Sequence, residues 1–93
     1  MYRIALSIRV RSGAAAGRSI ALADAETVIG RAGVQVVALR RSGDAHIAVA
    51  VEGEPPRVNG RPIAPGGQQL AVGDILEISG ARLELVLMAD GPG

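Results

Sequence analysis

The chain has 93 residues, of which 48% are hydrophobic and 1% aromatic, and its formal net charge is +1. A single small domain of this composition must build its core from Val, Ile, Leu and Ala side chains. It has no cysteine and one histidine, which excludes a disulfide scaffold, a thiol nucleophile and the usual zinc clusters. We therefore expect neither a metal nor a cofactor.

The first half of the chain predicts a series of short strands. Apolar and polar residues alternate from Tyr2 to Val10, and this period of two is typical of a half-buried strand. A Gly-rich loop at 12–17 follows, and then strands are predicted over 18–22, 27–29, 34–39 and 46–51. In the last of these, Ile47, Val49 and Val51 share one face, and His46, on the other face, is expected to point outward.

The stretch from Pro55 to Ile78 contains two turns. Asn59-Gly60 is a strong hairpin signal, because both central residues of a type I′ turn need positive φ. Gly73-Asp74 separates one apolar run from the next, which is predicted to be a strand over 75–78, and a final alternating strand is predicted over 81–87. About nine short strands with closely spaced turns predict an all-β fold without a substantial helix. We expect a small β-sandwich of two mostly antiparallel sheets.

Residues 1–88 are predicted to form this one domain, and residues 89–93 to begin a flexible linker in a longer chain. The N-terminus alternates where a signal peptide would carry an apolar core, and no apolar run approaches the ~20 residues of a membrane span. We therefore expect a cytoplasmic domain that does not itself contact a membrane. A membrane span after Gly93 in a longer protein remains open.

Few residues suggest catalysis. Asp44 could orient the ring of His46, since both lie on one side of an extended strand, but no serine or threonine lies in a nucleophile motif. Glu52 and Glu54 offer fewer oxygens than the about six that calcium requires, and we read both as solvated. The sequence predicts a protein that is not an enzyme.

Arginine supplies all ten basic residues. The candidate interaction residues, at loops or strand ends, are Arg31, Arg40, Arg41, Arg57, Asn59 and Arg61. Guanidinium groups bind phosphate and carboxylate through two parallel hydrogen bonds, so three arginines at one edge would form an oxyanion site. The sequence does not show whether they converge, and separate solvated arginines are the simpler expectation.

Several motifs occur in a characteristic order: an alternating first strand, a Gly-rich loop, Val28 to Arg31 (Val-Ile-Gly-Arg), Val58-Asn59-Gly60 and Leu70 to Gly80. This order resembles the forkhead-associated (FHA) family, whose members share Ile-Gly-Arg, Val-Asn-Gly and Leu-x-x-Gly-Asp segments. The resemblance covers almost the whole chain. It implies a β-sandwich that binds proteins through loops at one end, often by gripping phosphothreonine.

The residues that grip phosphothreonine in this family are mostly absent. Arg31 matches the family's arginine, but Ser42 and His46 are one residue too far apart for its Ser-x-x-His. Glu-Pro-Pro at 54–56 stands in place of its Asn-Gly-Thr, which adds a negative charge and removes two donors. The chain thus resembles a degenerate FHA-like domain that binds other proteins independently of phosphate. Such domains occur at the cytoplasmic end of inner-membrane ring proteins of bacterial type III secretion systems, so the predicted function is to scaffold a larger complex.

Two other functions stay open. A genuine phosphothreonine-peptide reader would use Arg31 together with Arg40 or Arg41. An RNA-binding module similar to the S4 type would use the hairpin from Arg57 to Ile63, because that family carries a comparable Val-Asn-Gly hairpin. The alternating residues upstream and the nearly neutral charge disfavour this reading, and we expect no nucleic-acid partner.

Overall fold

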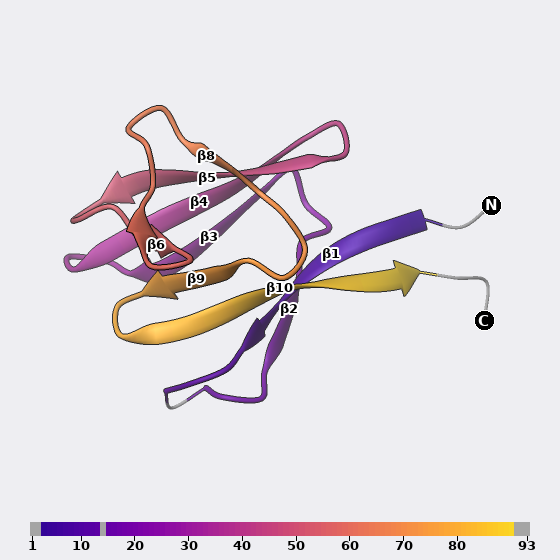
Figure 1. Ribbon diagram of the computed structural model, residues 1–93, viewed down its shortest axis with the longest axis horizontal. Helices are drawn as coiled ribbons and strands as arrows, with labels where there is room; N and C mark the ends of the chain where they lie inside the picture. The colour runs from indigo at the N-terminus through magenta and orange to yellow at the C-terminus, as the bar shows by residue number, and fades with distance from the viewer. Residues whose placement is uncertain (1–2, 14, 91–93) are drawn as a thin grey trace.

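The computed structural model describes residues 3–13 and 15–90, and within them every regular element is a β-strand. The strands are β1 (Arg3–Val10), β2 (Ser19–Ala21), β3 (Glu26–Arg31), β4 (Gln35–Ser42), β5 (Ala45–Glu52), β6 (Arg57–Val58), β7 (Arg61–Pro62), β8 (Gln68–Leu70), β9 (Ile75–Ile78) and β10 (Ala81–Asp90). They form a six-stranded sheet in the order β2-β1-β10-β9-β6-β7 and a four-stranded sheet in the order β3-β4-β5-β8. The pairings are antiparallel, which confirms the predicted all-β sandwich (Figure 1).

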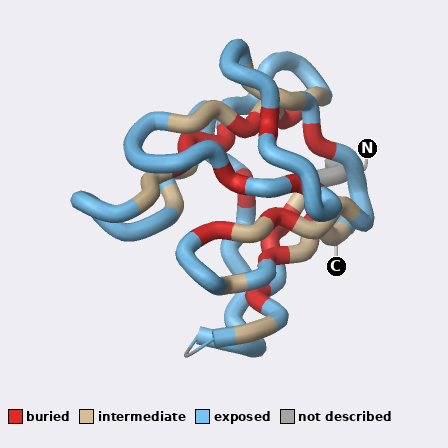
Figure 2. Tube along the Cα trace, turned by 60° about the vertical axis from the view of Figure 1, so that its left-hand side comes forward, coloured by how far each residue is buried: buried red, intermediate tan, exposed pale blue. Residues whose placement is uncertain are grey.

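The core lies between the two sheets and consists of branched aliphatic side chains. Ile8, Leu76 and Leu85 of the six-stranded sheet are fully buried, as are Val37 and Leu39 of the four-stranded sheet. Figure 2 shows the buried positions in the interior and exposed residues along the peripheral loops. Burial of each such side chain stabilises the fold by roughly 1.5–3 kcal/mol. Within the described residues, no Phe, Tyr or Trp side chain belongs to this core.

The strands β1 and β10 form the longest pairing of the fold. They align from Arg3–Asp90 to Val10–Leu83 and extend together past the body of the sandwich (Figure 1). β10 continues beyond the predicted end of the last strand, and residues 91–93 of the predicted tail lie outside the described residues. Tyr2, the first residue of the predicted strand 2–10, also lies outside them.

The prediction that His46 points outward is wrong. His46 is 6% exposed and faces the core, together with the buried Ala48, whereas Val51 on the opposite face of β5 is 58% exposed. The space between the sheets is already filled by large side chains such as Val37 and Leu39 of the neighbouring strand. Because interiors are close-packed, β5 contributes alanines there and turns its β-branched residues outward.

Candidate functional site

The turn after Arg31 forms one end of the four-stranded sheet. Residues 32–34 join β3 directly to β4, and the Val34 N–H donates to the Arg31 carbonyl at 3.0 Å. The Gly33 N–H donates to a carboxylate oxygen of Glu52, the last residue of β5. This tight turn has no room for the Ser-x-x-His loop of the FHA resemblance. One backbone N–H of the turn, that of Gly33, already donates to the Glu52 carboxylate of the chain itself.

Gln35 connects three loops at the same end. Its amide nitrogen donates to the Glu54 carbonyl at 2.8 Å, and its amide oxygen accepts the Ser79 N–H at 2.6 Å. Gly53 has a φ of +77°, and a Cβ atom there would lie 2.1 Å from the Val34 carbonyl oxygen. The loop after β5 is therefore held firmly against the turn after β3.

The sequence did not identify Gln35 or Glu52 as contributors to this end of the molecule. The available signal for Gln35 was a single amide side chain within the apolar segment 34–39. Glu52 gave no comparable signal, because its partner is a backbone N–H that lies 19 residues away in the chain. The reading of Glu52 and Glu54 as simply solvated therefore missed the hydrogen bond that Glu52 accepts.

Arg40 and Arg41 lie at the opposite end of β4 from Arg31. Arg31 pairs with the first residue of β4, and five residues at ~3.3 Å each place Arg40 about 16 Å further along the strand. The Arg40 guanidinium forms an ion pair with Glu26 at 2.8 Å, and that of Arg41 donates to the Ala23 carbonyl at 3.4 Å. The fold does not bring either arginine to Arg31.

Asn59 takes part in a hydrogen-bonded cluster that supports the fold. It lies between β6 and β7 with a φ of +53°, a conformation that asparagine tolerates better than most residues. Its side-chain oxygen accepts the Ile75 N–H and its amide nitrogen donates to Asp74, both at 3.0 Å. Asp74 also accepts the Ala71 N–H at 2.8 Å. This Asn59 clasp (Asn59, Ala71, Asp74 and Ile75) explains why the Asn-Gly and Gly-Asp motifs occur together.

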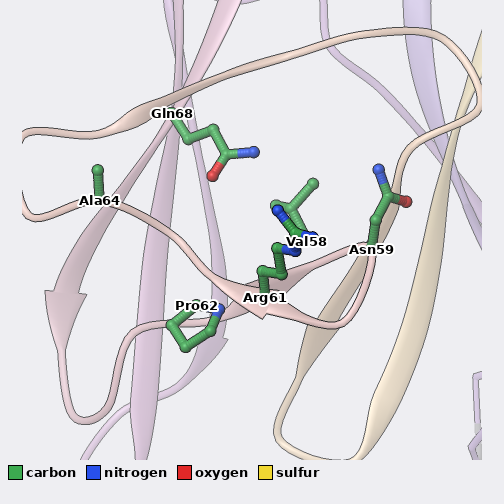
Figure 3. Close-up of a pocket in the computed structure, with 6 residues that line it drawn as sticks. All are labelled: Val58, Asn59, Arg61, Pro62, Ala64 and Gln68. Atoms are coloured by element: carbon green, nitrogen blue, oxygen red, sulfur yellow. The ribbon is translucent and has the colours of Figure 1, made fainter.

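Arg61 borders an open hollow between the β6–β7 hairpin and β8, which we call the Arg61 pocket (Figure 3). Its volume is about 620 Å³, and its lining residues are Val58, Asn59, Arg61, Pro62, Ala64 and Gln68. Val58 is 3% exposed and supplies an apolar floor, and the Gln68 side chain reaches toward the hairpin from β8. Among the described residues, no hydrogen bond or ion pair engages the Arg61 guanidinium.

Arg57 belongs to the same hairpin but is not among the residues that line the Arg61 pocket. Cross-strand neighbours share a face, and Arg57 is paired with Pro62 whereas Val58 is paired with Arg61. The Arg57 guanidinium lies 3.4 Å from the Gly60 carbonyl.

The described residues contain no group of three or more His, Cys, Asp and Glu side chains that could hold a metal ion. Both ring nitrogens of His46 are buried without a hydrogen-bond partner there, so Asp44 does not orient the ring. In the described part of the chain every regular element is a strand, and no helix there is long and apolar enough to cross a membrane.

The fold is similar to the folds of two solved FHA domain structures. The FHA domain of Rv0020c superposes with a TM-score of 0.73 over 92% of this chain and 95% of that domain, at 18% identity. A second solved structure comes from a structural and functional analysis of phosphothreonine-dependent FHA domain interactions. It also superposes with a TM-score of 0.73, over 88% of this chain and 95% of that chain, at 19% identity. The sequence matches no family model and no curated protein. The chain has an FHA-like fold.

Proposed function

We propose that this FHA-like domain is a non-enzymatic protein-interaction module whose binding does not depend on phosphothreonine. The observation that carries the proposal is the Glu52 carboxylate, which accepts the Gly33 N–H in the turn beside Arg31. A phosphate that approached Arg31 would meet this negative charge and that of Glu54 two residues on. Like charges at the binding end oppose a dianionic ligand.

The loop at 53–56 supports the same conclusion. Pro55 and Pro56 have no N–H to donate, and Pro56 is fully buried. The Pro56 carbonyl accepts the Ile63 N–H at 3.0 Å, so this end of the loop is anchored in the sandwich. A rearrangement that supplied phosphate donors would have to break these contacts.

We propose that partners bind at the Arg61 pocket. Its open guanidinium suits a carboxylate on a partner, which it can grip through two parallel hydrogen bonds. Pro62, which is exposed, offers apolar surface for a neighbouring aliphatic side chain. The preferred ligand is therefore a segment that carries an acidic residue next to an aliphatic one.

We also propose a scaffolding role in a larger complex on the cytoplasmic side of a bacterial membrane. This part rests on the resemblance to degenerate FHA-like domains of secretion rings and on the charge pattern at the Arg31 end. It does not require this domain to contact the membrane.

A peptide library in paired phosphothreonine and threonine versions tests the proposal. We expect selected peptides to be enriched in acidic and aliphatic residues, with no preference for the phosphorylated version. Binding should weaken about tenfold in Arg61→Gln, which removes the charge-assisted contact, and persist in Arg31→Gln. Selection of phosphorylated peptides that require Arg31 would overturn it.

A further inference from the structure

Asn59 is the only asparagine of the chain, and a glycine follows it. An asparagine in this position can lose its side-chain amide without an enzyme, because glycine has no side chain to shield its backbone nitrogen. Gly60 is exposed, and a Cβ atom there would meet no atom within 4 Å, so the space around it is open. The sequence therefore supplies the two groups of a spontaneous deamidation.

The reaction needs only these two residues and water. The Gly60 nitrogen attacks the Asn59 side-chain carbonyl carbon, and the new C–N bond closes a succinimide ring. The bond from that carbon to Nδ2 breaks, and the amide leaves as ammonia with the proton of the Gly60 N–H. Water then opens the ring at either carbonyl and leaves aspartate or isoaspartate.

The folded turn holds the reacting atoms apart. Asn59 and Gly60 have φ values of +53° and +84°, and they lie between the paired residues Val58 and Arg61. This is a type I′ turn, in which the first central residue has a ψ of about +30°. At that ψ the Gly60 nitrogen points away from the Asn59 side chain, so ring closure requires a large rotation about the Cα–C bond. The rotation disrupts the turn that joins β6 to β7.

The Asn59 clasp also restrains the amide itself. The amide oxygen accepts the Ile75 N–H and the amide nitrogen donates to Asp74, both at 3.0 Å. The Asn59 backbone N–H donates to the Ile75 carbonyl at 2.8 Å. The amide cannot turn toward the Gly60 nitrogen while these hydrogen bonds persist. Opening of the hairpin is therefore the step that permits the reaction.

The products do not fit the clasp. Conversion replaces the amide nitrogen, a donor, with a carboxylate oxygen that can only accept. This oxygen would face the Asp74 carboxylate at the 3.0 Å separation of the present hydrogen bond, where like charges repel. Isoaspartate also routes the main chain through the former side chain, which lengthens the turn. Since Asn59 lines the Arg61 pocket, conversion changes that pocket as well.

We propose that Asn59 is a spontaneous modification site whose reactivity is controlled by opening of the β6–β7 hairpin. The closed hairpin preserves the asparagine, and each opening exposes it to deamidation. Because the products cannot rebuild the clasp, the reaction makes the opening irreversible. The stability of the clasp thus sets a chemical limit to the lifetime of the domain. This site is independent of the proposed ligand at the Arg61 pocket.

Mass spectrometry of the 93-residue chain, incubated at mildly alkaline pH with and without denaturing urea, tests the proposal. The mass increase of deamidation should accumulate at least about tenfold faster in urea, since only opened hairpins react. Peptide mapping should place aspartate and isoaspartate at position 59. Without urea, Asp74→Ala should deamidate faster than the unmodified chain, because it removes one side of the clasp. Asp44→Ala is the matched control, since Asp44 is exposed in the turn before β5, and it should deamidate as the unmodified chain does.

Circular dichroism checks that both variants are folded, and Asn59→Asp tests the product directly. This variant should unfold at a lower urea concentration than the unmodified chain, and added salt should reduce the difference by screening the two carboxylates. A folded chain that deamidates as fast as the chain in urea contradicts the proposal, as does a chain in urea that keeps its asparagine. So does a folded Asp74→Ala variant that deamidates no faster than the unmodified chain, or an Asn59→Asp variant of unchanged stability.

Discussion

Replacement of Asn59 by alanine should destabilise the domain through the Asn59 clasp. The substitution removes the hydrogen bonds to Ile75 and Asp74, both 3.0 Å long, and places alanine at a φ of +53°. Each hydrogen bond contributes about 0.5–1.5 kcal/mol, and we take the lower half of that range because the clasp is exposed. The two bonds then amount to about 1–2 kcal/mol.

The left-handed backbone conformation adds to this loss. Alanine at positive φ costs about 1 kcal/mol relative to a residue that tolerates it. The free energy of unfolding should therefore fall by about 2–3 kcal/mol in Asn59→Ala. With a urea m-value near 1 kcal/mol/M for a small domain, the midpoint should shift down by about 2–3 M.

Urea unfolding monitored by far-ultraviolet circular dichroism measures this change. Asn59→Gly is the matched control, because glycine keeps the backbone conformation and loses the hydrogen bonds alone, so it should lose about 1–2 kcal/mol. A double-mutant cycle between Asn59→Ala and Asp74→Ala should give a coupling of about 0.5–1.5 kcal/mol. An Asn59→Ala variant whose free energy of unfolding lies within about 0.5 kcal/mol of the unmodified chain would contradict this prediction.

Two further substitutions test the interior and the Arg31 end by the same unfolding assay. His46→Leu should stabilise the domain by about 1–3 kcal/mol, because it replaces two buried ring nitrogens that lack partners with apolar atoms; a loss of stability would show that the ring is satisfied. Gly53→Ala should lower the free energy of unfolding more than Gly43→Ala does. Both glycines have positive φ, but only at Gly53 would a Cβ atom lie 2.1 Å from a carbonyl oxygen. Equal losses of stability in the two variants would argue that the loop after β5 is not packed against the turn after β3.

The fold was predictable because its signals are local. Alternation over the first strand, the Asn-Gly turn and the apolar run of β9 each specify backbone conformation within a few residues, and β9 has the predicted bounds. The orientation of β5 was not predictable in this way. Both of its faces carry apolar residues, and which face is inward depends on the volume already filled by β4 and the opposite sheet.

The candidate site was only partly predictable, because it depends on contacts between distant parts of the chain. The sequence predicted a short loop after Arg31, and in the structure residues 32–34 join β3 to β4 there. It did not reveal that Glu52 would occupy a donor of that turn, or that β4 would separate Arg40 from Arg31. It also grouped Asn59 with the interaction residues, whereas the structure shows its side chain engaged by Asp74 and Ile75.

We propose above that the Arg31 end of the domain does not read phosphothreonine. The most direct measurement is calorimetric titration of the chain with one peptide in matched phosphothreonine and threonine forms, chosen from the library for binding. We predict equal affinities for the two forms and no effect of Arg31→Ala, since the Glu52 carboxylate already accepts the Gly33 N–H beside Arg31. Micromolar binding of the phosphorylated form alone, abolished by Arg31→Ala, would contradict it.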